Sequence, residues 1–98
     1  MIKLEINDDQ KGKVMDVVKS AISAEVRRME IGLKKTNAQI EKLEKKYNTS
    51  SGIFLRDFRA EDLKDGDREY VQWTGELKIR ERIMDELNKL KDIEYVAH

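Results

Sequence analysis

The sequence contains no cysteine and no proline among its 98 residues. Without cysteine, the chain forms no disulfide, has no thiol nucleophile and offers no thiolate to zinc. This absence also suits a reducing compartment, so we expect a cytoplasmic protein. Without proline, no backbone donor is missing, and nothing in the backbone chemistry forces a kink into a long helix.

Histidine, long apolar runs and net charge are also scarce. The one histidine, His98, ends the chain, either as a native residue or as part of a tag, so a histidine triad or a multi-histidine metal site is excluded. No apolar run approaches the roughly 20 residues of a membrane span, and residues 1–6 lack the apolar core of a signal peptide. Twenty basic residues balance twenty acidic ones, without the basic excess typical of nucleic-acid-binding proteins. We therefore expect no membrane association and no cofactor, and the balance of charge argues against a nucleic-acid partner.

What the sequence has is charge and helical periodicity. Charged residues make up 41% of the chain, which is typical of long exposed helices. An apolar stripe comprises Met15, Val18, Ile22, Val26, Met29, Leu33, Thr36, Ile40, Leu43 and Tyr47, and from Ile22 onward its steps alternate between four and three residues, as in a coiled-coil seam. The stripe predicts one helix over residues 9–47, with Gly12 and Gly32 inside it and a cap from the Asn-Asp-Asp segment 7–9.

Shorter elements are expected on both sides of this helix. Apolar residues alternate with charged ones near the N-terminus, which predicts a strand with one buried face. Ser50 or Ser51 is expected to cap a second helix, and an Asp-Gly-Asp turn precedes a third. We expect one domain over residues 1–98, with a strand over 2–6, helices over 9–47, 51–59 and 67–91, and a strand over 93–97.

These elements predict a mainly α fold with a minor β part: a long antiparallel helical hairpin, a short helix at its turn and short terminal strands. The third helix is shorter than the first, so it covers the stripe only from its C-terminal end to about Ile22. Met15, Val17, Val18 and Ile22 then need other cover, which we expect in part from the terminal strands. Because a two-stranded sheet alone is marginal in water, we expect a homodimer, with strand pairing across it as one way to complete the cover.

Acidic residues are the candidates for a catalytic or metal site. One cluster comprises Glu61, Asp62, Asp65, Asp67 and Glu69. It lacks the calcium-loop spacing of alternating acids, a glycine and a distal glutamate, so we interpret it as a solvated linker and helix cap, with a surface for a basic partner as the alternative. A small hydrolase with carboxylates on facing helices is a further alternative, but the Glu-x-x-His pairs of helical metal bundles are absent. We expect no catalytic residue and no metal.

Basic pairs and a tryptophan are the other candidates. The residues proposed for nucleic-acid contact, in an alternative function, are Arg27, Arg28, Lys34 and Lys35. Acidic residues interleave with them, which favours ion pairs on the helix surface. Trp73 follows Tyr70 on the third helix; we interpret Trp73 as a core anchor, with a partner-facing hot spot as the alternative.

The second half of the chain contains a pattern of residues: Leu43-Glu44, Lys46-Tyr47, Ser50-Ser51, Phe54, Phe58, Asp65, Asp67 and Trp73. In this pattern the chain resembles a group of small archaeal and bacterial proteins described as antitoxin components of toxin–antitoxin pairs. The similarity extends over about residues 43–90, and Asn48 stands where the pattern has a glycine. The resemblance implies a binding protein and carries over no catalytic residue.

We therefore expect a non-enzymatic helical protein–protein interaction module, in one form an antitoxin-like partner that covers a small toxin such as a nuclease. The alternatives are a nucleic-acid-binding regulatory module and a structural homodimer. The candidate partner-binding residues are Met15, Val18, Ile22, Tyr70 and Trp73.

Overall fold

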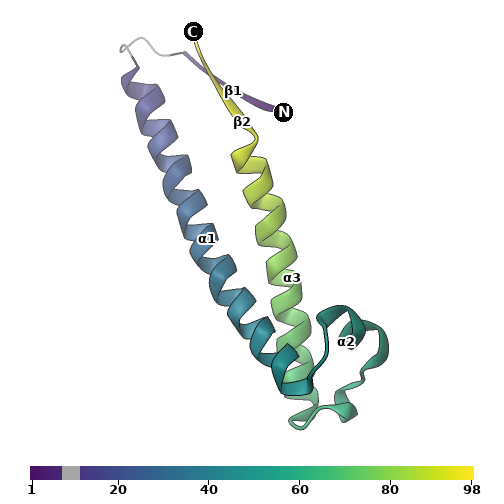
Figure 1. Ribbon diagram of the computed structural model, residues 1–98. Helices are drawn as coiled ribbons and strands as arrows, with labels where there is room; N and C mark the ends of the chain where they lie inside the picture. Colours follow the sequence, from purple (N-terminus) through teal and green to yellow (C-terminus); the bar gives the residue numbers. More distant parts are fainter. Residues whose placement is uncertain (8–11) are drawn as a thin grey trace. The chain divides into compact units, whose positions relative to one another are not determined.

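The computed structural model describes residues 1–7 and 12–98 (Figure 1). The elements in chain order are β1 (Ile2–Ile6), α1 (Lys13–Tyr47), α2 (Ser51–Asp57), a 3₁₀ turn (Ala60–Asp62), α3 (Gly66–Lys91) and β2 (Ile93–Ala97). The predicted fold class is confirmed: two long helices form a hairpin with a short helix at its turn and short strands at the termini. Within the described ranges, no helix combines the length and apolar character that crossing a membrane requires.

The first helix begins later than predicted. Gly12, which we expected inside a helix over residues 9–47, precedes α1 with a φ of 88°, a conformation that favours glycine. The helix begins at Lys13, and the Gly12 carbonyl accepts the N–H of Asp16 at 2.9 Å. The predicted caps Asp8 and Asp9 lie outside the described residues.

The predicted second helix, over residues 51–59, is two residues too long. Ser50 is its N-cap, as expected, and the Ser50 side chain accepts the N–H of Ile53 at 3.2 Å. The helix ends at Asp57 because the next two residues are extended, and a 3₁₀ turn that we did not predict follows. The third helix begins at Gly66, one residue earlier than expected.

The C-terminus of α1 ends at a left-handed residue. Asn48 has a φ of 48°. The N–H of Thr49 donates to the Glu44 carbonyl at 3.0 Å, and that of Asn48 donates to the Lys45 carbonyl at 3.3 Å. These two bonds make a Schellman motif, whose left-handed position is most often glycine and sometimes asparagine.

Substitution of Asn48 should therefore change stability in a direction set by the backbone. Asn48→Gly is expected to raise the free energy of unfolding by about 0.5–1 kcal/mol, because glycine adopts this φ without steric cost. Asn48→Ala is expected to lower it by about 1 kcal/mol, because a methyl side chain is strained there. Denaturant unfolding followed by the fluorescence of the single tryptophan tests both changes. A destabilised glycine variant would contradict the assignment.

The chain divides into two compact units, Met1–Gly32 with Ile83–His98, and Leu33–Arg82. In the first unit, β1 and β2 pair in parallel, with Ile2 opposite Ile93 and Ile6 opposite Ala97. The N-terminal part of α1 runs antiparallel to the C-terminal part of α3. Glu30 forms a 3.3 Å ion pair with Lys91 in this unit.

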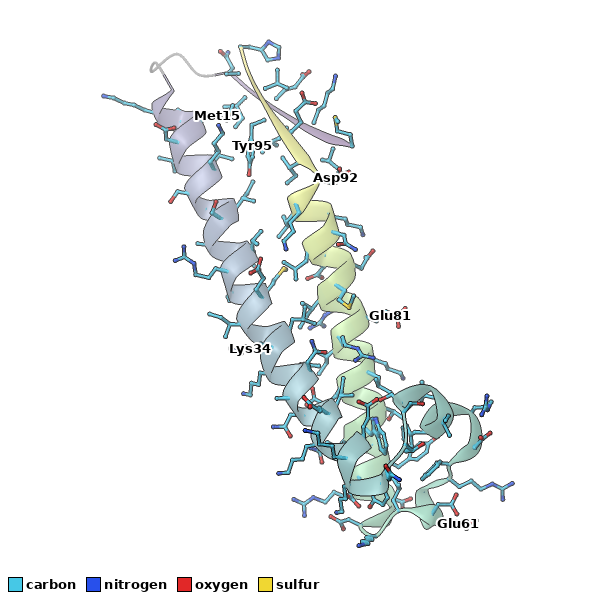
Figure 2. The ribbon with its side chains drawn as sticks, in the orientation of Figure 1. Met15, Lys34, Glu61, Glu81, Asp92 and Tyr95 are labelled. Carbon is cyan, nitrogen blue, oxygen red and sulfur yellow. The ribbon has the colours of Figure 1, made fainter. Side chains whose placement is uncertain are left out.

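The apolar stripe predicted from the sequence is buried or half-buried at all ten of its positions. In the first unit, Met15 is only 7% exposed, so this chain itself covers it, whereas Val17 remains 68% exposed. The Lys19 ammonium lies 5.3 Å from the Tyr95 ring centroid, which brings β2 against this part of α1. Figure 2 labels Met15 and Tyr95 at the same end of this unit. Cover of Met15 and Val18 by the terminal strands stays a prediction.

The second unit has an aromatic core. Its buried members are Leu43, Phe54, Leu63 and Trp73. The rings of Phe54 and Trp73 stack with centroids 3.9 Å apart and planes inclined by 2°. Trp73 has no exposed surface, so the interpretation of this residue as a core anchor is confirmed.

Candidate protein-binding surface

The start of α3 is held to the end of α1 by a carboxylate. Glu69 is 6% exposed and accepts hydrogen bonds from Lys46 Nζ at 2.7 Å, from the Asp65 N–H at 2.8 Å and from the Tyr47 hydroxyl. The Tyr47 hydroxyl oxygen in turn accepts the N–H of Lys64 at 2.8 Å. Hydrogen bonds from Lys46 and Tyr47 lower the pKa of Glu69 to about 2, so it is a structural anion at neutral pH.

A second polar chain anchors the short helix α2. The indole N–H of Trp73 donates to Ser51 Oγ at 2.9 Å, and the Ser51 hydroxyl donates to Glu44 Oε2 at 2.9 Å. The Ser51 backbone N–H donates to the same Glu44 oxygen at 2.8 Å. Glu44, Ser51 and Trp73 therefore have structural roles at this end of the fold.

Two residues of the acidic cluster, Asp62 and Glu69, act as caps because their carboxylates accept backbone N–H groups. Asp62 accepts the Arg59 N–H at 2.8 Å at the 3₁₀ turn, and Glu69 accepts the N–H of Asp65. Across residues 1–7 and 12–98, no group of three or more acidic or histidine side chains is placed to hold a metal ion.

A groove opens between α2 and α3 on the surface of the second unit. It has a volume of about 450 Å³ and is lined by Leu55, Tyr70, Thr74, Leu77, Lys78 and Glu81. Leu55 is 56% exposed, whereas Tyr70 and Leu77 are half-buried. The Thr74 hydroxyl donates to the Tyr70 carbonyl at 2.9 Å, so it is satisfied within its own helix. Lys78 and Glu81 are exposed and, in the described part of the chain, belong to no ion pair (Figure 2 labels Glu81).

The exposed wall of the groove follows from the orientation of α2. In a helix of seven residues, Phe54 faces the core, and successive side chains turn by about 100°. The neighbours of Phe54, Ile53 and Leu55, are therefore directed away from the core, and they are 42% and 56% exposed. Tyr70 packs its ring against Phe54, with centroids 5.3 Å apart, and lines the groove together with Leu55.

The partner-binding residues predicted from the sequence are divided between the two units. Met15, Val18 and Ile22 lie in the first unit, where Met15 is buried and the other two are half-buried. Of the second pair, Tyr70 lines the groove, whereas Trp73 lies beneath the surface. Their contact with a partner stays a prediction.

Apart from Tyr70, the residues that line the groove were not predicted from the sequence as partner-binding residues. Two apolar residues flanking a core phenylalanine in a very short helix are the signal that points to Leu55.

The basic residues proposed for nucleic-acid contact are also divided. Arg27 and Arg28 belong to the first unit, and Lys34 and Lys35 belong to the second. The Arg28 guanidinium donates from Nε to Glu25 at 2.9 Å, so part of this charge is neutralised within α1. Nucleic-acid contact stays a prediction.

Comparison of the sequence with protein-family models and with curated proteins, and of the fold with solved structures, finds no match.

The shifted carboxyl of Glu69 predicts a pH dependence of stability. Its pKa is about 2 in the folded chain, against an ordinary 4.5, so the unfolded chain binds this proton first as the pH falls. The stabilising contribution of Glu69 is complete above about pH 4.5 and is lost as the pH falls towards 2. In chemical unfolding between about pH 5 and pH 2, Glu69→Gln should show a shallower loss of stability than the wild type.

The control for this measurement is Glu61→Gln, which removes an exposed carboxylate from the neighbouring turn. It should keep the slope of the wild type. Equal slopes for the wild type and Glu69→Gln would show that the Glu69 contacts do not hold the carboxylate in its charged form.

Proposed function

We propose that this chain is a non-enzymatic helical protein–protein interaction module, and that its partner binds in the groove between α2 and α3. The observation that carries the proposal is Leu55, a large apolar side chain that is 56% exposed at the wall of a concave surface. Half-buried Tyr70 and Leu77 beside it give a partner side chain an apolar surface that is already ordered. Apolar and aromatic anchors in such hollows dominate the energetics of many interfaces.

The occupant that fits this groove is an amphipathic helix of another protein. Tyr70, Thr74, Leu77 and Glu81 recur on α3 at steps of three and four residues, so they form one face of that helix. A partner helix with apolar residues at the same spacing interdigitates with such a face. Lys78 and Glu81 at the rim present both signs of charge, which favours a partner with opposite charges in the matching order.

An antitoxin-like role is the particular form that the sequence resemblance implies. In that form, the module binds a small toxin, such as a nuclease, and acts sterically by covering its working surface. The mechanism requires complementary surfaces and slow dissociation, and it requires no reactive group on this chain. The protein encoded beside this chain is the first partner to test, because toxin and antitoxin components are produced together.

A substitution in the groove distinguishes this proposal from non-specific hydrophobic association. The chain is co-expressed with the protein encoded beside it, and the affinity of the purified complex is measured by calorimetry. Leu55→Asp should weaken binding by roughly 30-fold or more, the effect of losing an interface hot spot. The matched control is Ile53→Asp, which places the same charge on the same helix at a residue that does not line the groove.

The control should bind like the wild type, and both variants should keep the helical circular dichroism signal. Absence of a complex with the wild-type chain would contradict the antitoxin-like form. Equal loss of binding in both variants, or in neither, would contradict the groove as the binding surface.

A further inference from the structure

The sheet of the first unit consists of two parallel strands, in the order β1–β2. Each strand therefore has a strand neighbour on one side only within the described part of the chain. Sheets of this size are marginal in water, and parallel strands usually occur in larger sheets that are covered on both faces. An exposed strand edge is a template for pairing with another strand.

The hydrogen bonds between β1 and β2 define which backbone groups remain at the outer edge of β1. The N–H of Ile2 donates to the Asp92 carbonyl at 3.2 Å, and the Ile6 carbonyl accepts the N–H of His98 at 2.9 Å. In a parallel ladder, alternate residues of a strand bond to the same neighbour. The bonding groups of Ile2, Leu4 and Ile6 therefore face β2. The N–H and carbonyl groups of Lys3 and Glu5 face the open edge.

Two-fold pairing of this edge with itself has few registers. In an antiparallel pair, hydrogen-bonded positions join residues whose backbone groups both face the new neighbour. The choices within β1 place Lys3 opposite Lys3, Glu5 opposite Glu5, or Lys3 opposite Glu5. The first two bring like charges together, which destabilises a strand pair, whereas the third brings opposite charges together twice.

We infer that β1 pairs antiparallel with β1 of a second copy of this chain, in the register centred on Leu4, to form a four-stranded sheet in the order β2–β1–β1–β2. Lys3 of each copy lies opposite Glu5 of the other. The two positions exchange four backbone hydrogen bonds in total, since each hydrogen-bonded pair contributes two. The second copy is the occupant because the sequence Ile-Lys-Leu-Glu-Ile is complementary to itself when reversed.

The side-chain neighbours that this register creates on the two faces of the sheet are favourable. Glu94 is the neighbour of Lys3 across the β1–β2 pair. In the four-stranded sheet, Lys3 therefore lies between Glu94 of its own chain and Glu5 of the second copy, and the charges alternate in sign. On the other face, Ile2, which is 41% exposed, gains Ile6 of the second copy as a neighbour.

The outer edge of β2 is a poorer choice for self-pairing. By the same alternation, Ile93, Tyr95 and Ala97 present their backbone groups at that edge. Two-fold pairing centred on Tyr95 places Glu94 opposite Val96 of the second copy, so no charge pair forms. The charged residues of β1 thus favour its own edge.

Charge reversal at two positions gives a test with an internal control. The oligomeric state is measured by sedimentation equilibrium. The wild type should dimerise with a Kd in the micromolar range, because interfaces below about 1,200 Å² are usually weak. Lys3→Glu alone places two carboxylates opposite each other, and Glu5→Lys alone places two ammonium groups opposite each other. Each variant alone should raise the dimer Kd at least tenfold.

Mixing the two variants in equal amounts should restore association. One pair then joins Lys3→Glu in one chain with Glu5→Lys in the other, and the second pair joins the unchanged Glu5 with the unchanged Lys3, so both pairs bring opposite charges together. The product should be a heterodimer, which a mass-tagged copy of one variant identifies in native mass spectrometry. Restored association also shows that both variants are folded. A matched control is the pair Glu41→Lys and Lys45→Glu, which reverses an exposed ion pair of α1 and should leave the dimer Kd unchanged.

A wild type that stays monomeric at high concentration would overturn the inference. A dimer that both strand variants retain, or that mixing fails to restore, would also overturn it, because a different surface would then hold the copies together. The test is independent of the groove: Leu55→Asp leaves β1 intact, so the partner complex and the homodimer can fail separately.

Discussion

The stack of Phe54 on Trp73 is the contact on which the second unit depends. Two flat rings at 3.9 Å exclude water completely, and they join a seven-residue helix to a long one. A helix as short as α2 is not stable by itself, because too few internal hydrogen bonds offset the cost of ordering it. The ring stack and the hydrogen bond from the indole to Ser51 therefore hold α2 in place. The groove exists because α2 is held there.

Burial of polar groups follows from the same geometry. A tryptophan with no exposed surface must pair its indole N–H, and Ser51 supplies the acceptor while its own donors are directed to Glu44. Glu69 repeats the arrangement with three donors. The hairpin end is thus fixed in one conformation by directional bonds within an apolar cluster, which a surface of interleaved charges does not provide. An ordered surface of this kind loses little conformational freedom when it binds a partner.

Periodicity in the sequence predicted the long elements well, because the packing of α1 and α3 depends on the same spacing that the heptad shows. Local backbone geometry was harder to predict. The φ of Gly12 and the end of α2 depend on how the chain must turn, and a pattern of apolar residues does not encode that. Glu69 is one of five acids in its stretch, and only contacts with Lys46 and Tyr47 distinguish it. Leu55 and Ile53 are equally apolar, so the exposed wall of the groove required the placement of α2.

The parallel pairing of β1 with β2 joins Ile2 to Ile93, residues at opposite ends of the sequence. Contacts between such distant residues carry a large loop-closure entropy when the intervening chain is disordered. Local helix formation and closure of the hairpin shorten that loop, so the sheet should form late in folding. The edge of β1 then becomes an ordered surface only after β2 has been synthesised and docked. A partly synthesised chain therefore lacks this edge, which delays contact between neighbouring chains until the helices have folded.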